Sequence, residues 1–241
     1  MGGKIRLYVD ADLEPGQPVG LSRGQAHYLG AVMRQAPGAC VHLFNGRDGE
    51  WAARIETLGK RAATAICTGQ TRPLESSADL WLLFAPVKKA RTDFIVEKAT
   101  EMGASRIVPV MTDFTNAERV RRERLQAHAA EAAEQCGGTF VPEVTEAMRF
   151  DRVMSAWEPT RKLMFCDETR AGVRADAPGN AAARDPWAVL VGPEGGFSDR
   201  ERAILAAHPS AFPVALGPRI LRADTAVVAA LALWQFTIGT W

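Results

Sequence analysis

Short apolar runs alternate with amphipathic stretches from residue 80 to the end of the chain. Each run, bounded by glycine, proline or polar residues, predicts a buried strand. The expected strands cover residues 80–85, 106–111, 163–166, 188–191 and 213–216. The spacing of apolar positions predicts helices over 91–102, 118–135, 151–157 and 198–208, and a last one that begins at 224–225. This alternation predicts an α/β domain with a parallel sheet covered on both faces, whose ligand site lies beyond the carboxyl ends of the strands.

The N-terminal part of the chain follows a different pattern. Apolar runs at 5–9, 41–44 and 62–67 predict short strands, a helix is expected over 23–34, and residues 45–49 have the composition of a hairpin turn. We therefore expect a small β-rich barrel domain over residues 1–72 and the α/β domain over 73–241, joined by a linker that begins at Arg72. Residues 170–187 are expected to form a surface connection.

Two glycine-bearing loops follow predicted strands, at 192–196 and 217–219. Glycine lets a backbone approach a ligand closely, so these loops predict a binding site. Ser198 and Glu201 have the spacing of a capping box at the start of the next helix. The loops lack the lysine of a phosphate-binding loop, and the chain contains no G-x-G-x-x-G sequence. What remains is a backbone-lined pocket with one carboxylate, Glu194, and two arginines, Arg219 and Arg222. Such a site suits an adenosine-like ligand better than a polyphosphate.

Composition and charge limit the choice of function only weakly. The 241 residues are 47% hydrophobic and 24% charged, and the net charge of +1 neither requires nor excludes a nucleic-acid partner. The four cysteines are dispersed without metal-ligand spacing, so we expect reduced thiols and no metal. The N-terminus leads into no apolar targeting segment, and no apolar run has the length of a membrane span, so we expect a soluble cytoplasmic protein.

Charge is unevenly distributed between the two expected domains. Residues 1–72 carry nine Lys and Arg against six Asp and Glu, and the remainder carries 20 against 22. Two explanations account for this imbalance equally well. One is statistical scatter, and the other is a basic module that contacts phosphate. The arginine-rich stretch 119–124 is interleaved with Glu118 and Glu123, so we expect a solvated helix face there.

The loop sequences closely resemble the paired signature of the RsmE-type methyltransferases of the SPOUT class. The similar residues are LVGPEGGFS over 190–198, Glu201, and LGPRILR over 216–222. Further similarity lies at 27–29 with 32–34, in the helix of that family's PUA-like domain, at Lys88 with 97–103, and at 134–137. The chain departs from the family at Ala223-Asp224, where Thr-Glu is usual, and at Gly138, where arginine is common. These departures put in doubt any contact that the family makes there, although Asp224 can still cap a helix.

The resemblance implies a trefoil-knotted parallel-sheet domain preceded by a PUA-like β-barrel, assembled as a homodimer. It implies methylation of N3 of a uridine in 16S ribosomal RNA with S-adenosyl-L-methionine as the methyl donor. The residues then expected to hold the cofactor are Phe165, Glu168, Val191, Gly192, Glu194, Gly195, Gly196, Leu216, Gly217, Arg219, Ile220, Leu221 and Thr225. At Gly195 and Gly217 we expect a side chain to block the cofactor.

The implied chemistry assigns two catalytic candidates. N3 of uracil must lose its proton to become a good nucleophile, so a cation near the uracil carbonyls and a proton acceptor both help. We expect Arg222 to supply the cation. Glu194 either accepts the proton or fixes its own loop by accepting backbone amides. The RNA-contacting surface is expected to comprise Arg6, Arg23, His27, Arg34, Lys88, Lys89 and Arg91.

Two other functions stay open from the sequence. One is a SPOUT methyltransferase that acts on another RNA or on a ribose hydroxyl. The other is a catalytically silent RNA-binding module, which needs no cofactor. The last helix, with its apolar run 226–236, packs either in the core or against a second subunit.

Overall fold

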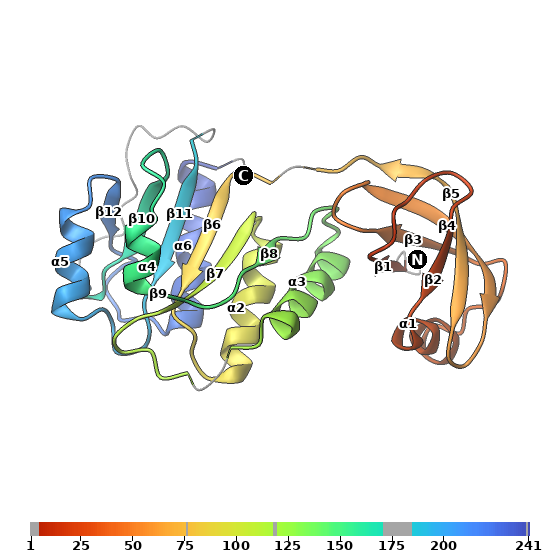
Figure 1. The fold of residues 1–241 in the computed structure, drawn as a ribbon, viewed down its shortest axis with the longest axis horizontal. Coiled ribbons are helices and arrows are strands. Elements are labelled where there is room, and N and C mark those ends of the chain that lie inside the picture. The colour runs from red at the N-terminus through yellow and green to blue at the C-terminus, as the bar shows by residue number, and fades with distance from the viewer. Residues whose placement is uncertain (1–4, 76, 118–119, 171–184, 240) are drawn as a thin grey trace. The chain divides into compact units, whose positions relative to one another are not determined.

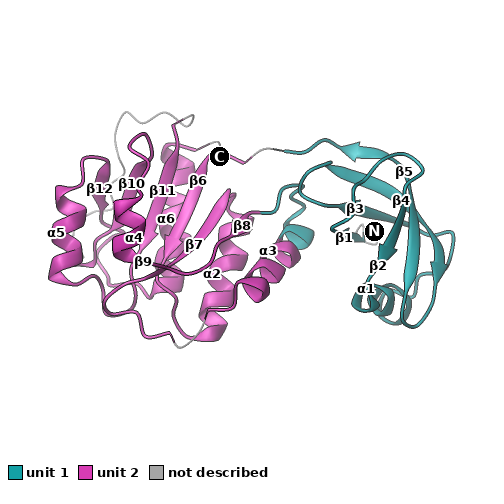
Figure 2. Cartoon of the chain, in the orientation of Figure 1, with its two compact units in different colours: residues 1–76, 133–141 teal, residues 77–132, 142–241 magenta. Residues whose placement is uncertain are grey.

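The computed structural model describes residues 5–75, 77–117, 120–170, 185–239 and 241. The chain forms two compact units, which Figure 2 shows in separate colours. Unit 1 comprises residues 1–76 and 133–141, and unit 2 comprises residues 77–132 and 142–241. The segment 133–141 therefore belongs with the N-terminal residues, although we expected it in the second domain. Most of the expected surface connection, 171–184, lies outside the described residues.

Unit 1 is built on a five-stranded sheet in the order β1-β3-β4-β5-β2. Its strands are β1 (Arg6–Tyr8), β2 (Pro18–Leu21), β3 (Cys40–Phe44), β4 (Glu50–Leu58) and β5 (Ala63–Arg72). The three expected strands are confirmed, and β4 pairs antiparallel with β3 across the expected hairpin turn. We did not predict β2 and β4. In β4, polar residues such as Arg54 and Glu56 interrupt the apolar positions, although alternate residues such as Ala53 and Ile55 are fully buried.

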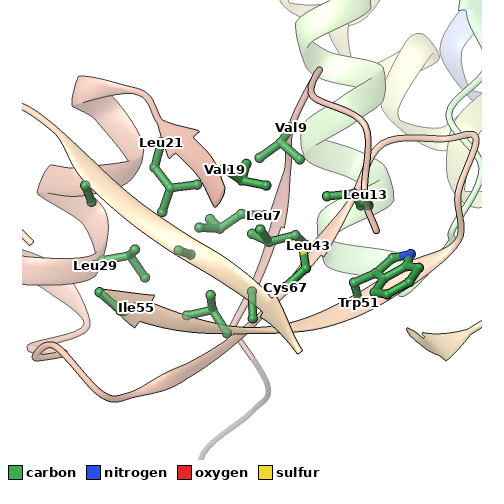
Figure 3. Close-up of a cluster of buried hydrophobic side chains, with 14 of the residues drawn as sticks. Leu7, Val9, Leu13, Val19, Leu21, Leu29, Leu43, Trp51, Ile55 and Cys67 are labelled. Carbon is green, nitrogen blue, oxygen red and sulfur yellow. The ribbon is translucent and has the colours of Figure 1, made fainter. Parts of the chain in front are cut away.

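The core of unit 1 gathers side chains from every strand of this sheet. Figure 3 shows Leu7, Val19, Leu43, Ile55 and Cys67 converging between the strands, and all five are buried. Apolar burial of this kind supplies the main favourable free energy of folding. The small unit therefore has a core of its own.

The expected helix 23–34 is regular only in its first half. Helix α1 (Arg23–His27) begins with a capping box between Ser22 and Gln25 and continues as a π-helix, η1 (Tyr28–Val32). Our expectation of one regular α-helix is therefore wrong after His27. Glycine, which occupies position 30, has low helix propensity, and wider turns of this kind interrupt α-helices locally.

Unit 2 is built on a parallel sheet in the order β12-β10-β11-β6-β7-β8 (Figure 1). Its strands are β6 (Leu80–Phe84), β7 (Arg106–Met111), β8 (Glu143–Val144), β10 (Lys162–Cys166), β11 (Trp187–Val191) and β12 (Ala211–Val214), and β9 (Met148–Arg149) pairs with β7. Every described pair in this sheet is parallel, which confirms the expected sheet type. Strand β12 ends at Val214, its partner Cys166 being the last residue of β10, so our expected strand 213–216 is placed two residues too late.

Helices cover this sheet. They are α2 (Lys89–Glu101), α3 (Arg122–Cys136), α4 (Phe150–Ser155), α5 (Asp199–Ala207) and α6 (Ala223–Thr237), with a short 3₁₀-helix, η2 (Glu168–Arg170). Phe150 of α4 and Leu205 of α5 pack in one cluster with Leu83, Val108 and Leu190 of the strands. These contacts place α4 and α5 on the same face of the sheet.

The last helix, α6, packs inside unit 2. Val227, Leu231 and Trp234 are fully buried, and the Gln235 side chain donates to the carbonyl of Met102 at 2.7 Å. The face of α6 with Val227, Leu231 and Trp234 therefore packs in the core of unit 2, whereas Phe236 of the same apolar run is exposed. No helix in the described part of the chain is long and apolar enough to cross a membrane.

Candidate active site

A pocket lies at the carboxyl ends of the neighbouring strands β12, β10 and β11. Because the three strands are parallel, their last residues meet at one edge of the sheet, and the loops that follow form the walls. Both glycine loops contribute to it. The lining residues are Cys166, Asp167, Glu168, Val191, Gly192, Pro193, Glu194, Gly195, Gly196, Val214, Leu216, Gly217, Arg219, Ile220, Leu221, Ala223 and Ala226.

Most of the residues that we expected at the cofactor line this pocket, but Phe165 and Thr225 do not. Phe165 is buried in the cluster with α4 and α5, and Thr225 is exposed on α6. Their neighbours Cys166 and Ala226 line the pocket instead. Side chains alternate along a strand, and Ala223 and Ala226 lie three residues apart on one helix face, so the periodicities of the two elements explain these differences.

The first glycine loop is tied to the end of strand β10 through Glu168. Gly196 has a φ of +72°, and a Cβ at this position would lie 2.5 Å from the carboxyl carbon of Glu168. The Glu168 Oε1 atom accepts hydrogen bonds from the backbone N–H of Phe197 at 3.2 Å and from Arg202 at 2.6 Å. Glycine at 196 therefore provides the space in which this carboxylate joins β10 to the start of α5.

A buried carboxylate anchors the start of α5. The predicted capping box is confirmed, since the backbone N–H of Ser198 donates to Glu201 Oε2 at 2.9 Å and the Glu201 N–H donates to the Ser198 hydroxyl at 3.2 Å. The other oxygen of Glu201, which is fully buried, accepts from the backbone N–H of Asp113 at 2.8 Å. Hydrogen bonds from Ser198 and Arg200 lower the pKa of Asp113 in turn. The loop after β7 and the first glycine loop are thereby held together.

The two glycines at which we expected a side chain to block the cofactor have different surroundings. Gly217 has a φ of +112°, and no described atom lies within 4 Å of the position that its Cβ would take. At Gly195 a Cβ would lie 3.3 Å from the Cβ of Phe114. An added methyl group at 217 would therefore project into open space at the pocket wall, whereas one at 195 would press on Phe114.

Cys166 forms an apolar part of the pocket wall. Burial raises the pKa of its thiol to about 12, and the nearby charge of Glu168 adds to the effect. The thiol is therefore protonated at neutral pH. Among the described residues, no three or more His, Cys, Asp or Glu side chains are arranged to hold a metal ion.

A second pocket adjoins the first and is lined by cations. Its lining residues are Lys88, Arg91, Glu194, Ile220, Leu221 and Arg222. Glu194, Ile220 and Leu221 line both pockets, whereas Arg222 lines only the second. No ion pair holds Arg222 in the part of the chain that the structure describes. The expected start of the last helix is confirmed to within one residue, because α6 begins at Ala223. Its N-cap residue is Arg222, and Asp224 lies in the first turn, so our expectation that Asp224 caps the helix is wrong.

Glu194 is held by an ion pair that connects the cofactor loop to α2. Its carboxylate accepts a hydrogen bond from Arg91, whose Nε lies 3.8 Å from Asp224. We expected Arg91 on the RNA-contacting surface, and the structure places it in the second pocket. The partner of Glu194 is thus a side chain of α2, whereas one of the two roles that we considered for Glu194 was to accept the backbone amides of its own loop. Its other role, as a proton acceptor, stays a prediction.

Arg6 lies inside unit 1. Its side chain is 9% exposed and forms an ion pair with Glu50 at 2.6 Å. It also donates to the carbonyls of Ala133 at 2.7 Å and Gly138 at 2.7 Å. These bonds occupy the guanidinium, so Arg6 does not belong to a phosphate-contacting surface. Gly138, one of the positions that depart from the family pattern, accepts one of these hydrogen bonds through its backbone carbonyl.

The other cations that we expected at RNA are accessible. Arg23 and His27 are exposed on α1, and Arg34 is exposed just after η1. Lys88 and Lys89 are exposed at the start of α2. Each of these side chains is free to meet a phosphate from solvent.

Family models match both parts of the chain. An RNA methyltransferase domain matches residues 74–235, and an RNA methyltransferase PUA domain matches residues 21–66. The ribosomal RNA small subunit methyltransferase E of Rickettsia conorii is 27% identical over 229 residues, which cover 94% of this chain and 93% of the relative. The protein of the same name from Synechocystis is 30% identical over 218 residues, which cover 89% of this chain and 71% of the relative.

Solved structures share the whole fold. The ribosomal RNA small subunit methyltransferase E of Neisseria gonorrhoeae, crystallised with S-adenosylmethionine, has a TM-score of 0.85 at 27% identity, with 98% of each chain covered. A Legionella pneumophila protein solved with the same cofactor has a TM-score of 0.82 at 27% identity, with 97% of this chain and 98% of that chain covered. This chain belongs to the RNA methyltransferase family that includes the ribosomal RNA small subunit methyltransferases E.

Proposed function

We propose that this protein transfers the methyl group of S-adenosyl-L-methionine to N3 of a uridine in 16S ribosomal RNA. The observation that carries the proposal is the pair of adjoining pockets, one walled by glycine loops and the other lined by Lys88, Arg91 and Arg222. A methyl donor and its acceptor must meet at a shared boundary, and here Glu194, Ile220 and Leu221 form that boundary. The names of the relatives support the ribosomal RNA substrate, and the resemblance of the loops supports the uridine N3 position.

The first pocket fits the cofactor chemically. Val191, Leu216 and Leu221 offer apolar walls for a flat adenine ring, and Ala223 and Ala226 keep the adjoining face of α6 small. The carboxylates of Asp167 and Glu168 are acceptors suited to hydroxyl and ammonium groups. When bound there, S-adenosylmethionine supplies a methyl group activated by the positive sulfur atom.

Arg222 is the proposed catalytic residue on the acceptor side. As a uracil loses the proton from N3, negative charge spreads to its carbonyl oxygens, and a nearby guanidinium stabilises that charge. The N-terminal end of α6, where Arg222 is the N-cap, adds a positive partial charge of the helix dipole. The other requirement is that the acceptor pocket orients N3 of the uracil toward the methyl carbon of the donor.

Glu194 acts as a positioning residue in this proposal. By pairing with Arg91, its carboxylate fixes a cation in the acceptor pocket and also joins the first glycine loop to α2. Any loss of this carboxylate therefore acts on the substrate through Arg91.

The remaining expectations complete the proposal. We propose that the protein works in the cytoplasm as a homodimer, that its α/β domain is closed by a trefoil knot, and that Arg23, His27 and Arg34 of unit 1 contact RNA phosphates. Exposed arginines near a histidine provide charge for backbone recognition without base specificity. Sedimentation analysis of the purified protein tests the dimer, and a single monomeric boundary at micromolar concentration would count against it.

The main experiment identifies the methylated atom. Purified protein is incubated with isotope-labelled S-adenosylmethionine and small ribosomal subunits that lack the modification, and the nucleosides of the digested 16S RNA are resolved by mass spectrometry. We expect label in 3-methyluridine. Label in a 2′-O-methylated nucleoside would assign the enzyme to a ribose hydroxyl instead. Absence of both label and calorimetric cofactor binding would indicate a catalytically silent RNA-binding protein.

A further inference from the structure

A basic cleft in unit 2 is lined by residues near the start of α2, by residues 116–117 and by residues near the start of α3. Its lining residues are Pro86, Val87, Lys88, Lys89, Thr92, Asn116, Ala117, Val120, Arg121, Arg124 and Leu125. Four of these side chains are cationic, and none is a carboxylate. The cleft and the cofactor pocket have no lining residue in common.

The cations of the cleft differ in whether their charge is already neutralised. Arg124 forms an ion pair with Asp93. Lys88, Lys89 and Arg121 are exposed, and no ion pair links any of them to another residue in the described ranges. Three positive charges therefore face solvent from one cleft. Their mutual repulsion is relieved when an anion enters.

Helix α2 contributes further positive potential at the same place. Its 13 residues begin at Lys89, its N-cap Lys88 makes no side-chain hydrogen bond, and its first turn contains no acidic residue. The N-terminal end of a helix carries a positive partial charge and unpaired N–H groups, which favour anions. This effect adds to the charges of Lys88, Lys89 and Arg121, so the cleft is suited to a polyanion.

Lys88 connects the cleft to the acceptor pocket, because its side chain lines both. A strand of RNA with one nucleotide in the acceptor pocket would thus pass its neighbouring phosphates across Lys88 into the cleft. An acidic protein is the other kind of polyanion that fits these charges. The continuity of the cleft with the acceptor pocket through Lys88 favours the substrate RNA, because the same molecule then occupies both.

We infer that this cleft binds the sugar-phosphate backbone next to the target uridine, with Lys89 and Arg121 each contacting a phosphate. The inference rests on the proposed function. It also divides the stretch 119–124, for which we expected only a solvated face. Arg121 serves the cleft, whereas Arg122 donates to the carbonyl of Val144 at 3.0 Å and Arg124 pairs with Asp93.

The test removes two charges from the cleft and two from elsewhere on unit 2. The cleft variant is Lys89→Gln with Arg121→Gln. The control is Arg149→Gln with Arg152→Gln, two exposed cations that do not line the cleft. Kinetics with small ribosomal subunits give kcat and KM, RNA binding is measured over a range of salt concentrations, and calorimetry gives the cofactor Kd.

The cleft variant should raise KM for the RNA substrate and leave the cofactor Kd unchanged. Loss of two phosphate contacts should reduce the slope of log K against log salt by about 1.4 to 1.8. The control should keep the wild-type slope. Equal KM and salt slope in the cleft variant and the control would overturn the inference while leaving the methylation itself established. A wild-type protein that methylates no RNA would instead overturn the proposed function. Both variants change exposed side chains, so their melting temperatures should match the wild type.

Discussion

Gly196→Ala should loosen the junction between strand β10 and helix α5, and with it the cofactor pocket. The φ of +72° at this position costs an alanine about 1–2 kcal/mol. The new Cβ would also lie 2.5 Å from the Glu168 carboxyl carbon, so the carboxylate must move. Its ion pair with the partly exposed Arg202 contributes about 0–1 kcal/mol, and its bond to the Phe197 N–H a similar amount. These ranges add to about 1–4 kcal/mol, and their central values to about 2–3 kcal/mol.

A penalty of this size is measurable in two ways. It should lower the melting temperature by roughly 4–12 °C for a domain of this size. Where the folded protein instead adopts another loop conformation, cofactor affinity should fall by about 30- to 150-fold. Differential scanning calorimetry and titration with S-adenosylmethionine separate the two contributions.

A double-mutant cycle with Glu168→Ala tests the cause. Removing the carboxylate removes the group that the new methyl would strike, so in that background Gly196→Ala should cost only the backbone strain. We therefore expect a coupling energy of about 1 kcal/mol or more between the two positions. The same penalty in both backgrounds would refute the explanation, since the contact with Glu168 would then play no part.

Three further predictions concern charge. Arg222→Ala should lower kcat by about 10²- to 10³-fold while leaving the cofactor Kd unchanged by calorimetry, and equal losses in both would assign Arg222 to binding. Glu194→Gln should raise KM for RNA through the released Arg91 and keep the shape of the pH–rate profile, whereas disappearance of the acidic limb of that profile would identify Glu194 as the proton acceptor. Burial raises the pKa of Glu50, but hydrogen bonds from Arg6 and Thr71 outweigh it and hold the pKa below its usual value. The stability from this pair is thus present above the ordinary carboxyl pKa of about 4.3 and lost as the pH falls through the lower folded value. The difference in melting temperature between wild type and Glu50→Gln should be largest at neutral pH and disappear in acid, and a difference independent of pH would contradict this assignment.

The sequence predicts unit 2 better than unit 1, and burial explains why. Strands β6 and β11 are interior strands of the sheet and are buried along almost their whole length, so all their side chains are apolar and the two runs are visible in the sequence. Strand β4 mixes buried and exposed positions over nine residues, and its three register shifts against β5 disturb the alternation further. A pattern search for continuous apolar runs finds the first kind of strand and misses the second.

The sequence predicts the parts of the candidate site that the main chain forms. It predicts less well the parts that depend on the direction and pairing of side chains. Glycine marks the loop at 192–196 because Gly196 has a positive φ. To predict which strand residue points into the pocket, one must know which alternate residues face the core. Phe165 lies in the core, so Cys166, the next residue of the strand, points to the other side. The pairing of Glu194 with Arg91 joins residues 103 positions apart in the chain, which no local spacing reveals.

Arg6 shows how long-range contacts also redefine the N-terminal unit. An arginine near the start of a basic stretch suggests a phosphate contact, but here it binds Glu50 and the carbonyls of residues 133–138, which belong to the same unit. The backbone N–H of Tyr8 likewise donates to Glu134 at 2.6 Å. A variant that lacks residues 1–72 would therefore lose the groups that the segment 133–141 contacts, as well as any RNA-contacting surface of unit 1. Charge substitutions at Arg23 and Arg34 leave these contacts in place, so they separate the role of unit 1 in RNA binding from its role in the fold.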